Sequence, residues 1–165
     1  MSDFDRDPGR RAGNPKSTAV VGGHPIHPML VPFPIVCFVG AFVTDIFFVY
    51  GAGLGWATAS KWLLGFGLLT AALAASAGLA DFKGDDRIRR LGVAVRHMIA
   101  NVTAIVIAAV NLLIRVTTPD TEVSIGVFLS GLTVLILLYS GWLGGHLVFV
   151  HRVGVSDESS SGHHH

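Results

Sequence analysis

Four long apolar segments constrain this chain more than any other feature of its sequence. They occupy residues 30–52, 56–80, 93–116 and 125–150, and only short connections separate them. A helix of about 20 apolar residues crosses the roughly 30 Å of hydrocarbon in a bilayer. Because a backbone inside lipid must satisfy its own hydrogen bonds, such segments predict membrane-spanning α-helices. The expected fold is an all-α, integral membrane four-helix bundle.

Composition agrees with lipid as the solvent. Charged residues make up 14% of the chain, whereas a soluble domain carries about 25%. The formal net charge is +1, which gives no support for binding nucleic acid. The single cysteine, Cys37, lies inside the first apolar segment, so the chain has no disulfide framework.

The ends of the chain differ from its middle. Residues 1–19 are polar and rich in Asp, Arg, Gly and Pro, which predicts a disordered tail. This tail is too long and too acidic to begin a cleaved signal peptide. Residues 20–155 form the expected transmembrane domain. Residues 156–165 form a C-terminal tail that ends in three histidines typical of a purification tag, and these are left out of the functional interpretation.

Basic residues predict the orientation. They gather in the N-terminal tail, in the connection after the second segment and just after the fourth segment, and they are scarce in the other two connections. The positive-inside rule places such regions in the cytoplasm. We therefore expect both termini inside, with the connection at residues 81–92 on the same side.

Five histidines remain outside the tag, and all of them fall in the cytoplasmic half of this topology. His24 and His27 precede the first apolar segment, His97 opens the third, and His146 and His151 close the fourth. An unpaired polar group in hydrocarbon costs several kcal/mol, and ionisable residues in membrane segments are usually functional. The clustering predicts a cofactor or metal site.

Two segments carry interior faces. In the third, polar and small residues recur every three or four positions, at His97, Asn101, Ala104, Ala108, Asn111 and Arg115. In the second, the small residues are Gly67, Ala71, Ala74 and Gly78, followed by Asp81. Helix packing explains the small residues better than a cofactor groove does. Asn101 is a candidate for orienting an imidazole.

Local geometry limits how the histidines meet. His24 and His27 each precede a proline, which disfavours helix and predicts an extended or re-entrant approach. His146 and His151 are five residues apart, or about 140° around a helix. Both can face one centre only if the helix frays near Val150 or the cofactor is wide.

Asp45 is a charged residue well inside the first segment. It lies about 22 Å along the helix from Leu30, at a depth similar to that of Lys61 in the second segment. Because an intramembrane charge generally finds a partner, we favour an Asp45–Lys61 ion pair. The alternative is a carboxylate on a proton path.

Two motifs resemble a known family. Residues 23–34 (GHPIHPMLVPFP) resemble the opening signature of the DUF2231 family of bacterial membrane proteins, and residues 141–155 (GWLGGHLVFVHRVGV) resemble its closing signature. Asp81, and His97 with Asn101, also fit the pattern, which spans residues 22–155. One departure is His146, where the family usually has a carboxylate.

The resemblance implies a cellular location and a class of function. The family is named for its unknown function, so its name implies no activity. Its members look like four-helix proteins of the bacterial cytoplasmic (inner) membrane. Some are joined to c-type cytochrome or Rieske domains, which implies redox work and a redox partner of that kind.

Two site chemistries compete. One is electron transfer through haem b, with His97 as one axial ligand and His27 or His151 as the other. The other is a mononuclear or dinuclear site for a transition metal ion such as Fe, Cu or Zn. Its candidate ligands are His24, His27, Asp81, His97, His146 and His151.

Two further alternatives involve no cofactor. A small transporter would line its path with Asp45, Lys61, Asn101 and Asn111, but four helices without an internal repeat argue against it. A structural membrane protein would use its histidines only to cap helices and contact lipid headgroups. The sequence has no nucleophile triad or phosphate loop, so as an enzyme the protein is at most a redox component. The sequence leaves the oligomeric state open.

Overall fold

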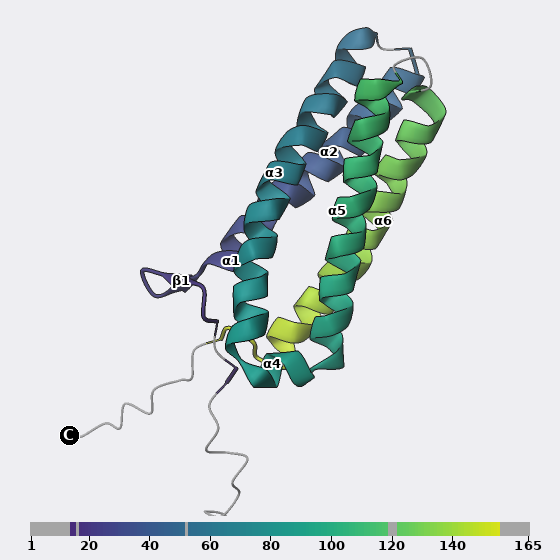
Figure 1. Ribbon diagram of the computed structural model, residues 1–165. Helices are drawn as coiled ribbons and strands as arrows, with labels where there is room; N and C mark the ends of the chain where they lie inside the picture. Colours follow the sequence, from purple (N-terminus) through teal and green to yellow (C-terminus); the bar gives the residue numbers. More distant parts are fainter. Residues whose placement is uncertain (1–13, 16, 52, 119–121, 156–165) are drawn as a thin grey trace, which may run out of the picture.

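The chain folds into a bundle of four long helices (Figure 1). This computed structural model describes residues 14–15, 17–51, 53–118 and 122–155, without the side chains of residues 122–124. Within them, four helices are long and apolar enough to cross a membrane: Ile26–Val49, Leu54–Gly84, Gly92–Thr117 and Ile125–Phe149. The predicted all-α membrane four-helix bundle is confirmed.

The secondary structure follows the apolar segments to within a few residues. The elements are β1 (Val20–Val21), β2 (His24–Pro25), α1 (Ile26–Leu30), α2 (Pro32–Val49), α3 (Leu54–Gly84), α4 (Asp86–Arg90), α5 (Gly92–Thr117) and α6 (Glu122–Phe149). The largest difference is in the connection expected at residues 81–92, which is mostly helical. There α3 continues to Gly84, and the side chain of Asp85 caps α4 by accepting from the Arg87 backbone N–H at 2.9 Å.

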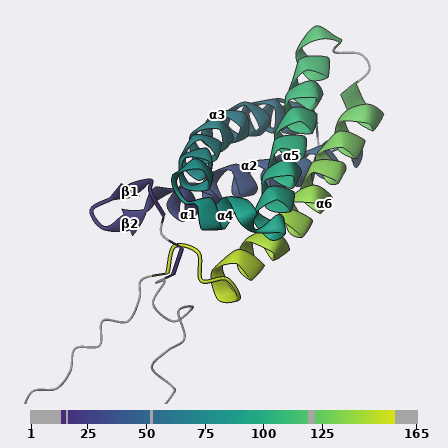
Figure 2. The same ribbon diagram turned by 60° about the horizontal axis from the view of Figure 1, so that its bottom comes forward.

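The four long helices form two hairpins that lie side by side. One hairpin is α2 with α3 and the other is α5 with α6, and they meet through α2 against α6 and α3 against α5 (Figures 1 and 2). The short α4 joins the hairpins at one end of the bundle, which we call the α4 end. The N-terminal β-hairpin and residues 151–155 lie at this end too. Which membrane face it occupies stays a prediction of the positive-inside rule.

Small residues fill the interior and large apolar ones face outward. Ala41, Ala104 and Ala108 are at most 1% exposed. Leu135 and Trp142 are 65% and 67% exposed, as expected of side chains that contact lipid. Small side chains let helices in a membrane approach closely, where dispersion contacts replace the hydrophobic effect.

The central core and the α4 end pack separately. The central cluster combines Phe38, Ala41, Leu64, Ala71 and Ala108, so it joins both hairpins. At the α4 end a second cluster packs α4 against the start of α5 and the end of α6. Its buried members are Ile88, Ala94 and Leu147. Ala71 and Ala108 of the central cluster belong to the interior faces predicted for the second and third segments, which are confirmed at these two positions.

The N-terminal β-hairpin leads the chain into α1. Val20 pairs with Pro25, and Val21 pairs with His24. Gly22 and Gly23 form the two-residue loop with φ of 57° and 83°. A loop with positive φ at both positions matches the twist of the two strands and strongly favours glycine. The hairpin therefore fixes the point at which α1 begins.

Candidate functional site

His27 is held at the bundle interior by α3. It lies in α1, and its Nδ1 is 2.8 Å from the carbonyl oxygen of Ala74. Because a carbonyl only accepts, Nδ1 carries a proton, and in the neutral imidazole this leaves the lone pair on Nε2. Among the described residues, no hydrogen bond reaches Nε2 of His27. The expected extended approach is right for His24 in β2 and wrong for His27, since the helix forms despite Pro28.

His97 is held in the same way by the other hairpin. It lies in α5, and its Nδ1 is 2.9 Å from the carbonyl oxygen of Ser140 in α6 and 3.0 Å from the Ser140 hydroxyl. The same reasoning puts the proton on Nδ1 and the lone pair on Nε2. Both histidines therefore hold their imidazoles through a backbone carbonyl of the partner helix in their own hairpin.

The two imidazoles meet between the hairpins. Their ring centroids are 6.5 Å apart and their planes are nearly perpendicular, at 87°. Each ring is half-buried, and the two come from opposite sides of the bundle. Of the five histidines, His27 and His97 are the pair that the fold places between the hairpins.

Glycines make room for both rings. A Cβ at Gly78 would lie 2.9 Å from two atoms of the His27 ring, which is too close without movement. A Cβ at Gly144 would lie 3.2 Å from the His97 ring. In each hairpin this glycine is four residues after the residue whose carbonyl holds the histidine. Packing was the preferred explanation for the small residues, and Gly78 packs against an imidazole.

The lone pair on Nε2 of His97 already accepts a hydrogen bond from the side chain of Asn101. Its Nδ2 is 3.0 Å from Nε2 of His97 and 3.0 Å from the His97 carbonyl oxygen, one turn earlier. The amide therefore donates to both. A metal at Nε2 would take the place of one amide hydrogen, so Asn101 competes for this nitrogen as well as contacting it.

His146 and His151 form a separate pair. Their ring centroids are 5.4 Å apart, and Trp142 lies 5.9 Å from His146. Helix α6 ends at Phe149, and the backbone N–H groups of Val150 and His151 both donate to the His146 carbonyl. The bond from His151 spans five residues instead of four, so the chain departs from regular α-helical geometry after Val150. The two rings lie together there, as the expected fraying near Val150 would allow.

Asp81 binds the N-terminal segment. Its Oδ1 accepts from the Ser17 hydroxyl and from the backbone N–H groups of Thr18 and Ala19, each at 2.8 Å. Residues 17–19 belong to the predicted N-terminal tail, and these bonds link them to α3. Residues 1–13, 16 and 156–165 of the two predicted tails lie outside the described residues. The remaining site candidate at this end, His24, is exposed in β2.

The six candidate metal ligands do not gather at one centre. Across the described ranges, no group of three or more His, Cys, Asp or Glu residues is arranged to hold a metal ion. The fold brings together His27 with His97, and His146 with His151. What remains between the hairpins is a two-imidazole donor set.

A buried ion pair lies at the opposite end of the bundle, and its partner is not the predicted one. Arg115 donates to both carboxylate oxygens of Asp45, at 2.7 Å each, and the two side chains are 4% and 2% exposed. The Asp45–Lys61 prediction is therefore wrong. Arg115 belongs to the interior face predicted for the third segment, and its guanidinium joins α5 to α2.

Neutral polar groups complete this cluster. Arg115 also donates to the Asn111 side chain and to the hydroxyls of Ser60 and Ser130, and Ser130 donates to Asp45 at 2.6 Å. All four long helices contribute, and every member is buried. A transporter path was expected to use Asp45 and Asn111, but here they bond to protein groups.

The two hairpins repeat one arrangement, which the sequence analysis did not detect. His27 is eighteen residues before Asp45, and His97 is eighteen residues before Arg115. Each histidine contacts its counterpart, and each charged residue contacts its counterpart. Eighteen helical residues span about 27 Å. The bundle is therefore joined across its centre at two levels, by imidazoles near the α4 end and by an ion pair at the other.

Comparison with known proteins identifies a family. The model of the family described as "Predicted membrane protein (DUF2231)" matches residues 23–157 of this chain. No curated protein and no solved structure matches the chain.

Proposed function

This chain belongs to the DUF2231 family of predicted membrane proteins, and we propose that it carries electrons through a b-type haem held by His27 and His97. The single observation that carries the proposal is the meeting of these two imidazoles between the hairpins, 6.5 Å apart. We also propose the orientation predicted from the basic residues. The site then faces the cytoplasmic side of a bacterial inner membrane.

The protonation of both rings supports metal coordination. A metal-bound histidine usually donates its other ring N–H to a carbonyl or carboxylate, which fixes the tautomer and the ring orientation. Both rings have such a bond already, to the carbonyls of Ala74 and Ser140. His27 thus offers Nε2 without a hydrogen bond from a described residue, whereas Nε2 of His97 would bind a metal only after the Asn101 amide gives up its hydrogen bond.

The number of protein ligands favours haem over a bare ion, and the spacing of the two rings suits a metal held between them. Two metal–nitrogen bonds of about 2 Å, extended by each ring, put imidazole centroids roughly 6 Å apart. A zinc site takes three or four protein ligands, and no group of three was found in the described chain. Haem needs only axial ligands from the protein. A pair of neutral imidazoles is therefore the donor set that fits it.

The chain's own residues hold the site and set its surroundings. Haem, when bound, supplies one-electron chemistry. His27 and His97 would hold it from opposite hairpins, and the carbonyls of Ala74 and Ser140 orient the two rings. Gly78 and Gly144 let the rings sit close to α3 and α6. Apolar helices around the site lower the local polarity, which is one of the ways a protein sets a reduction potential.

A redox partner completes the proposal. The fusions of the family with c-type cytochrome or Rieske domains support a partner of one of these kinds. The partner would meet the α4 end, where the histidines lie. The exposed side chains of Arg90 and Lys83 at this end suit an acidic partner surface.

An absorption spectrum tests the proposal. Protein purified in detergent, freed of its tag and reduced with dithionite, should show a shifted Soret band and sharp α and β bands of low-spin haem. His97→Ala and His27→Ala should lose these bands, and His24→Ala is the matched control because His24 is exposed in β2. A colourless protein that still binds Fe, Cu or Zn by elemental analysis would contradict haem and support the non-haem alternative. Absence of both would contradict any cofactor.

A further inference from the structure

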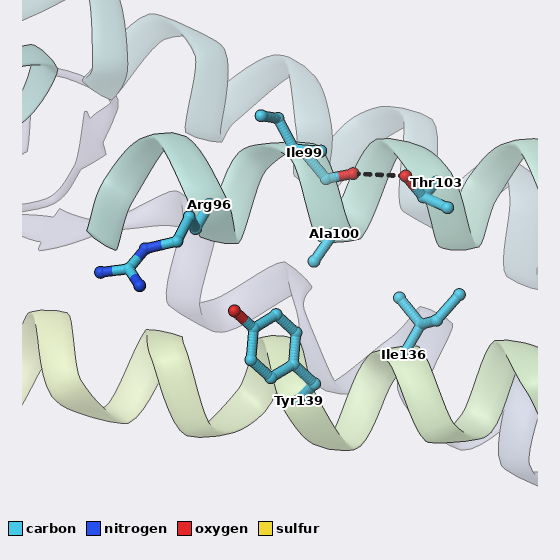
Figure 3. Close-up of a pocket in the computed structure, with 6 residues that line it drawn as sticks. All are labelled: Arg96, Ile99, Ala100, Thr103, Ile136 and Tyr139. Carbon is cyan, nitrogen blue, oxygen red and sulfur yellow. Dashed lines mark hydrogen bonds between the residues drawn. The ribbon is translucent and has the colours of Figure 1, made fainter. Parts of the chain in front are cut away.

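A groove on the outer face of the second hairpin lies directly behind the candidate site. It has a volume of about 260 Å³ and runs between α5 and α6 (Figure 3). Its lining residues are Arg96, Ile99, Ala100, Thr103, Ile136 and Tyr139. His97 bonds to Ser140 on the inner face, so Arg96 and Tyr139, one residue earlier in each helix, lie at nearly the same level on the outer face.

The polar groups of the groove gather at one end. The Arg96 guanidinium and the Tyr139 hydroxyl lie at the same end of the groove in Figure 3. Arg96 donates from Nε to the Gly92 carbonyl at 3.3 Å, and no carboxylate of a described residue pairs with it. No described residue hydrogen-bonds the Tyr139 hydroxyl. Among the described residues, the Arg96 charge thus has no counter-ion and the Tyr139 hydroxyl has no hydrogen-bond partner, so both are available to a ligand.

The rest of the groove is apolar. Ile99, Ala100 and Ile136 line it beyond Arg96, and the Thr103 hydroxyl is already bonded to the Ile99 carbonyl at 2.8 Å. From Arg96 to Thr103 the groove follows α5 for about 10 Å toward the middle of the bundle. Arg96 is four residues from the start of this membrane helix, so the polar end lies near the bilayer surface.

This polarity matches one class of ligand. We propose that the groove binds an anionic phospholipid, with its phosphate on Arg96 and Tyr139 and the start of one acyl chain along Ile99 and Ile136. Arginine recognises phosphate through charge-assisted, often paired hydrogen bonds. Basic pockets between membrane helices are known to hold anionic headgroups. A groove of this size takes only part of a phospholipid, and the remaining chain stays in the bilayer.

Neighbouring charges at the α4 end do not supply the same site. Arg87 and Arg89 are paired with Asp85 and Asp86. Arg90 is exposed on α4, outside the groove, and it therefore serves as a matched control for general surface charge.

Native mass spectrometry of the delipidated full chain tests the proposal, with added phosphatidylglycerol or phosphatidylcholine as probes. Phosphatidylglycerol should bind to the parent protein more tightly than phosphatidylcholine does. Arg96→Gln should weaken it by about fivefold or more, the contribution of one basic residue near a membrane surface. Arg96→Lys should retain part of the binding, Tyr139→Phe should reduce it less, and Arg90→Gln should leave it unchanged.

Three results would overturn the proposal. The first is equal binding of phosphatidylglycerol by the Arg96→Gln variant and the parent. The second is an equal loss with Arg90→Gln, which would indicate general charge attraction. The third is preferential binding of a neutral isoprenoid quinone that survives Arg96→Gln, which would assign the groove to a different amphiphile. Because Arg96 is exposed, all variants should fold, and their thermal unfolding in detergent checks this.

Discussion

Removing the charge of Asp45 should destabilise the bundle more than any other conservative change in it. Asp45→Asn keeps the shape of the side chain but leaves the Arg115 guanidinium charged, 4% exposed and without its counter-ion. Breaking a buried ion pair by removing one partner costs about 3–5 kcal/mol. At 1.4 kcal/mol per factor of ten, the lower figure already shifts the folding equilibrium by roughly a hundredfold.

The double variant shows why the single one is costly. Asp45→Leu with Arg115→Met removes both charges and keeps similar volume. Some groups left behind keep partners, because Ser60 donates to the Ala41 carbonyl at 3.3 Å, and Asn111 donates to the Gly126 carbonyl and to Ser130. The Asn111 side-chain oxygen and the Ser130 hydroxyl lose the partners that Arg115 and Asp45 supplied, so they must turn to each other. Replacing a whole buried pair with apolar residues is often neutral or stabilising. The double variant should therefore recover most of the loss.

Free energies of unfolding in mixed detergent–SDS titrations measure both effects. Lys61→Gln is the control for a cation at similar depth that is outside the Asp45 cluster. Three results would refute the reasoning: an Asp45→Asn variant as stable as the parent, a double variant as unstable as the sum of its single changes, or a Lys61→Gln loss that matches Asp45→Asn.

Three further changes test the α4 end. Gly78→Ala should displace the His27 ring and weaken haem binding. Gly65→Ala is the control, because an added Cβ there meets nothing within 4 Å. Equal haem affinities of the two variants would contradict the close approach of His27 to Gly78. Asn101→Val removes a hydrogen bond that competes for Nε2 of His97. Haem should therefore bind about two- to tenfold more tightly, which is the contribution of one net hydrogen bond. A loss of haem binding would instead show that Asn101 is needed to orient His97. Asp81→Asn weakens the bonds to residues 17–19, so amide exchange there should accelerate while exchange in α5 is unchanged; unaltered exchange at 17–19 would show that other contacts fix this segment.

The fold was predictable because membrane spans leave a direct signal in the sequence. Residues in hydrocarbon must be apolar and must form helices long enough to cross it, so the four segments were found to within a few residues. The inward side of α5 was also predictable. Ala104, Ala108, Asn111 and Arg115 share one face by their spacing, and all four are buried.

The pairing across the bundle was harder to predict. Lys61 was the expected partner of Asp45 because the two lie at a similar depth in adjacent segments. Contacts between hairpins depend on how they dock, and spacing within one helix does not reveal that. The usable signal was the matching interval of eighteen residues, from His27 to Asp45 and from His97 to Arg115. It was hidden because the matched residues carry opposite charges.

The sequence singles out the histidines, but it does not reveal how the fold groups them. The sequence marked all five histidines, yet it did not show which of them meet. His27 reaches His97 because α1 is helical despite the proline that follows His27. His146 instead meets His151, because the chain leaves regular α-helical geometry after the end of α6. Both outcomes depend on local backbone geometry that proline rules describe only as preferences.

A haem titration of the apoprotein, followed in the Soret region for the parent, His27→Ala and His97→Ala, tests the central claim most directly. The account predicts saturation at an equimolar ratio with a low-spin spectrum in the parent, and loss of that spectrum in both variants, while His151→Ala titrates like the parent. A low-spin, equimolar complex that survives either His27→Ala or His97→Ala would contradict the assignment of these two imidazoles as the ligands.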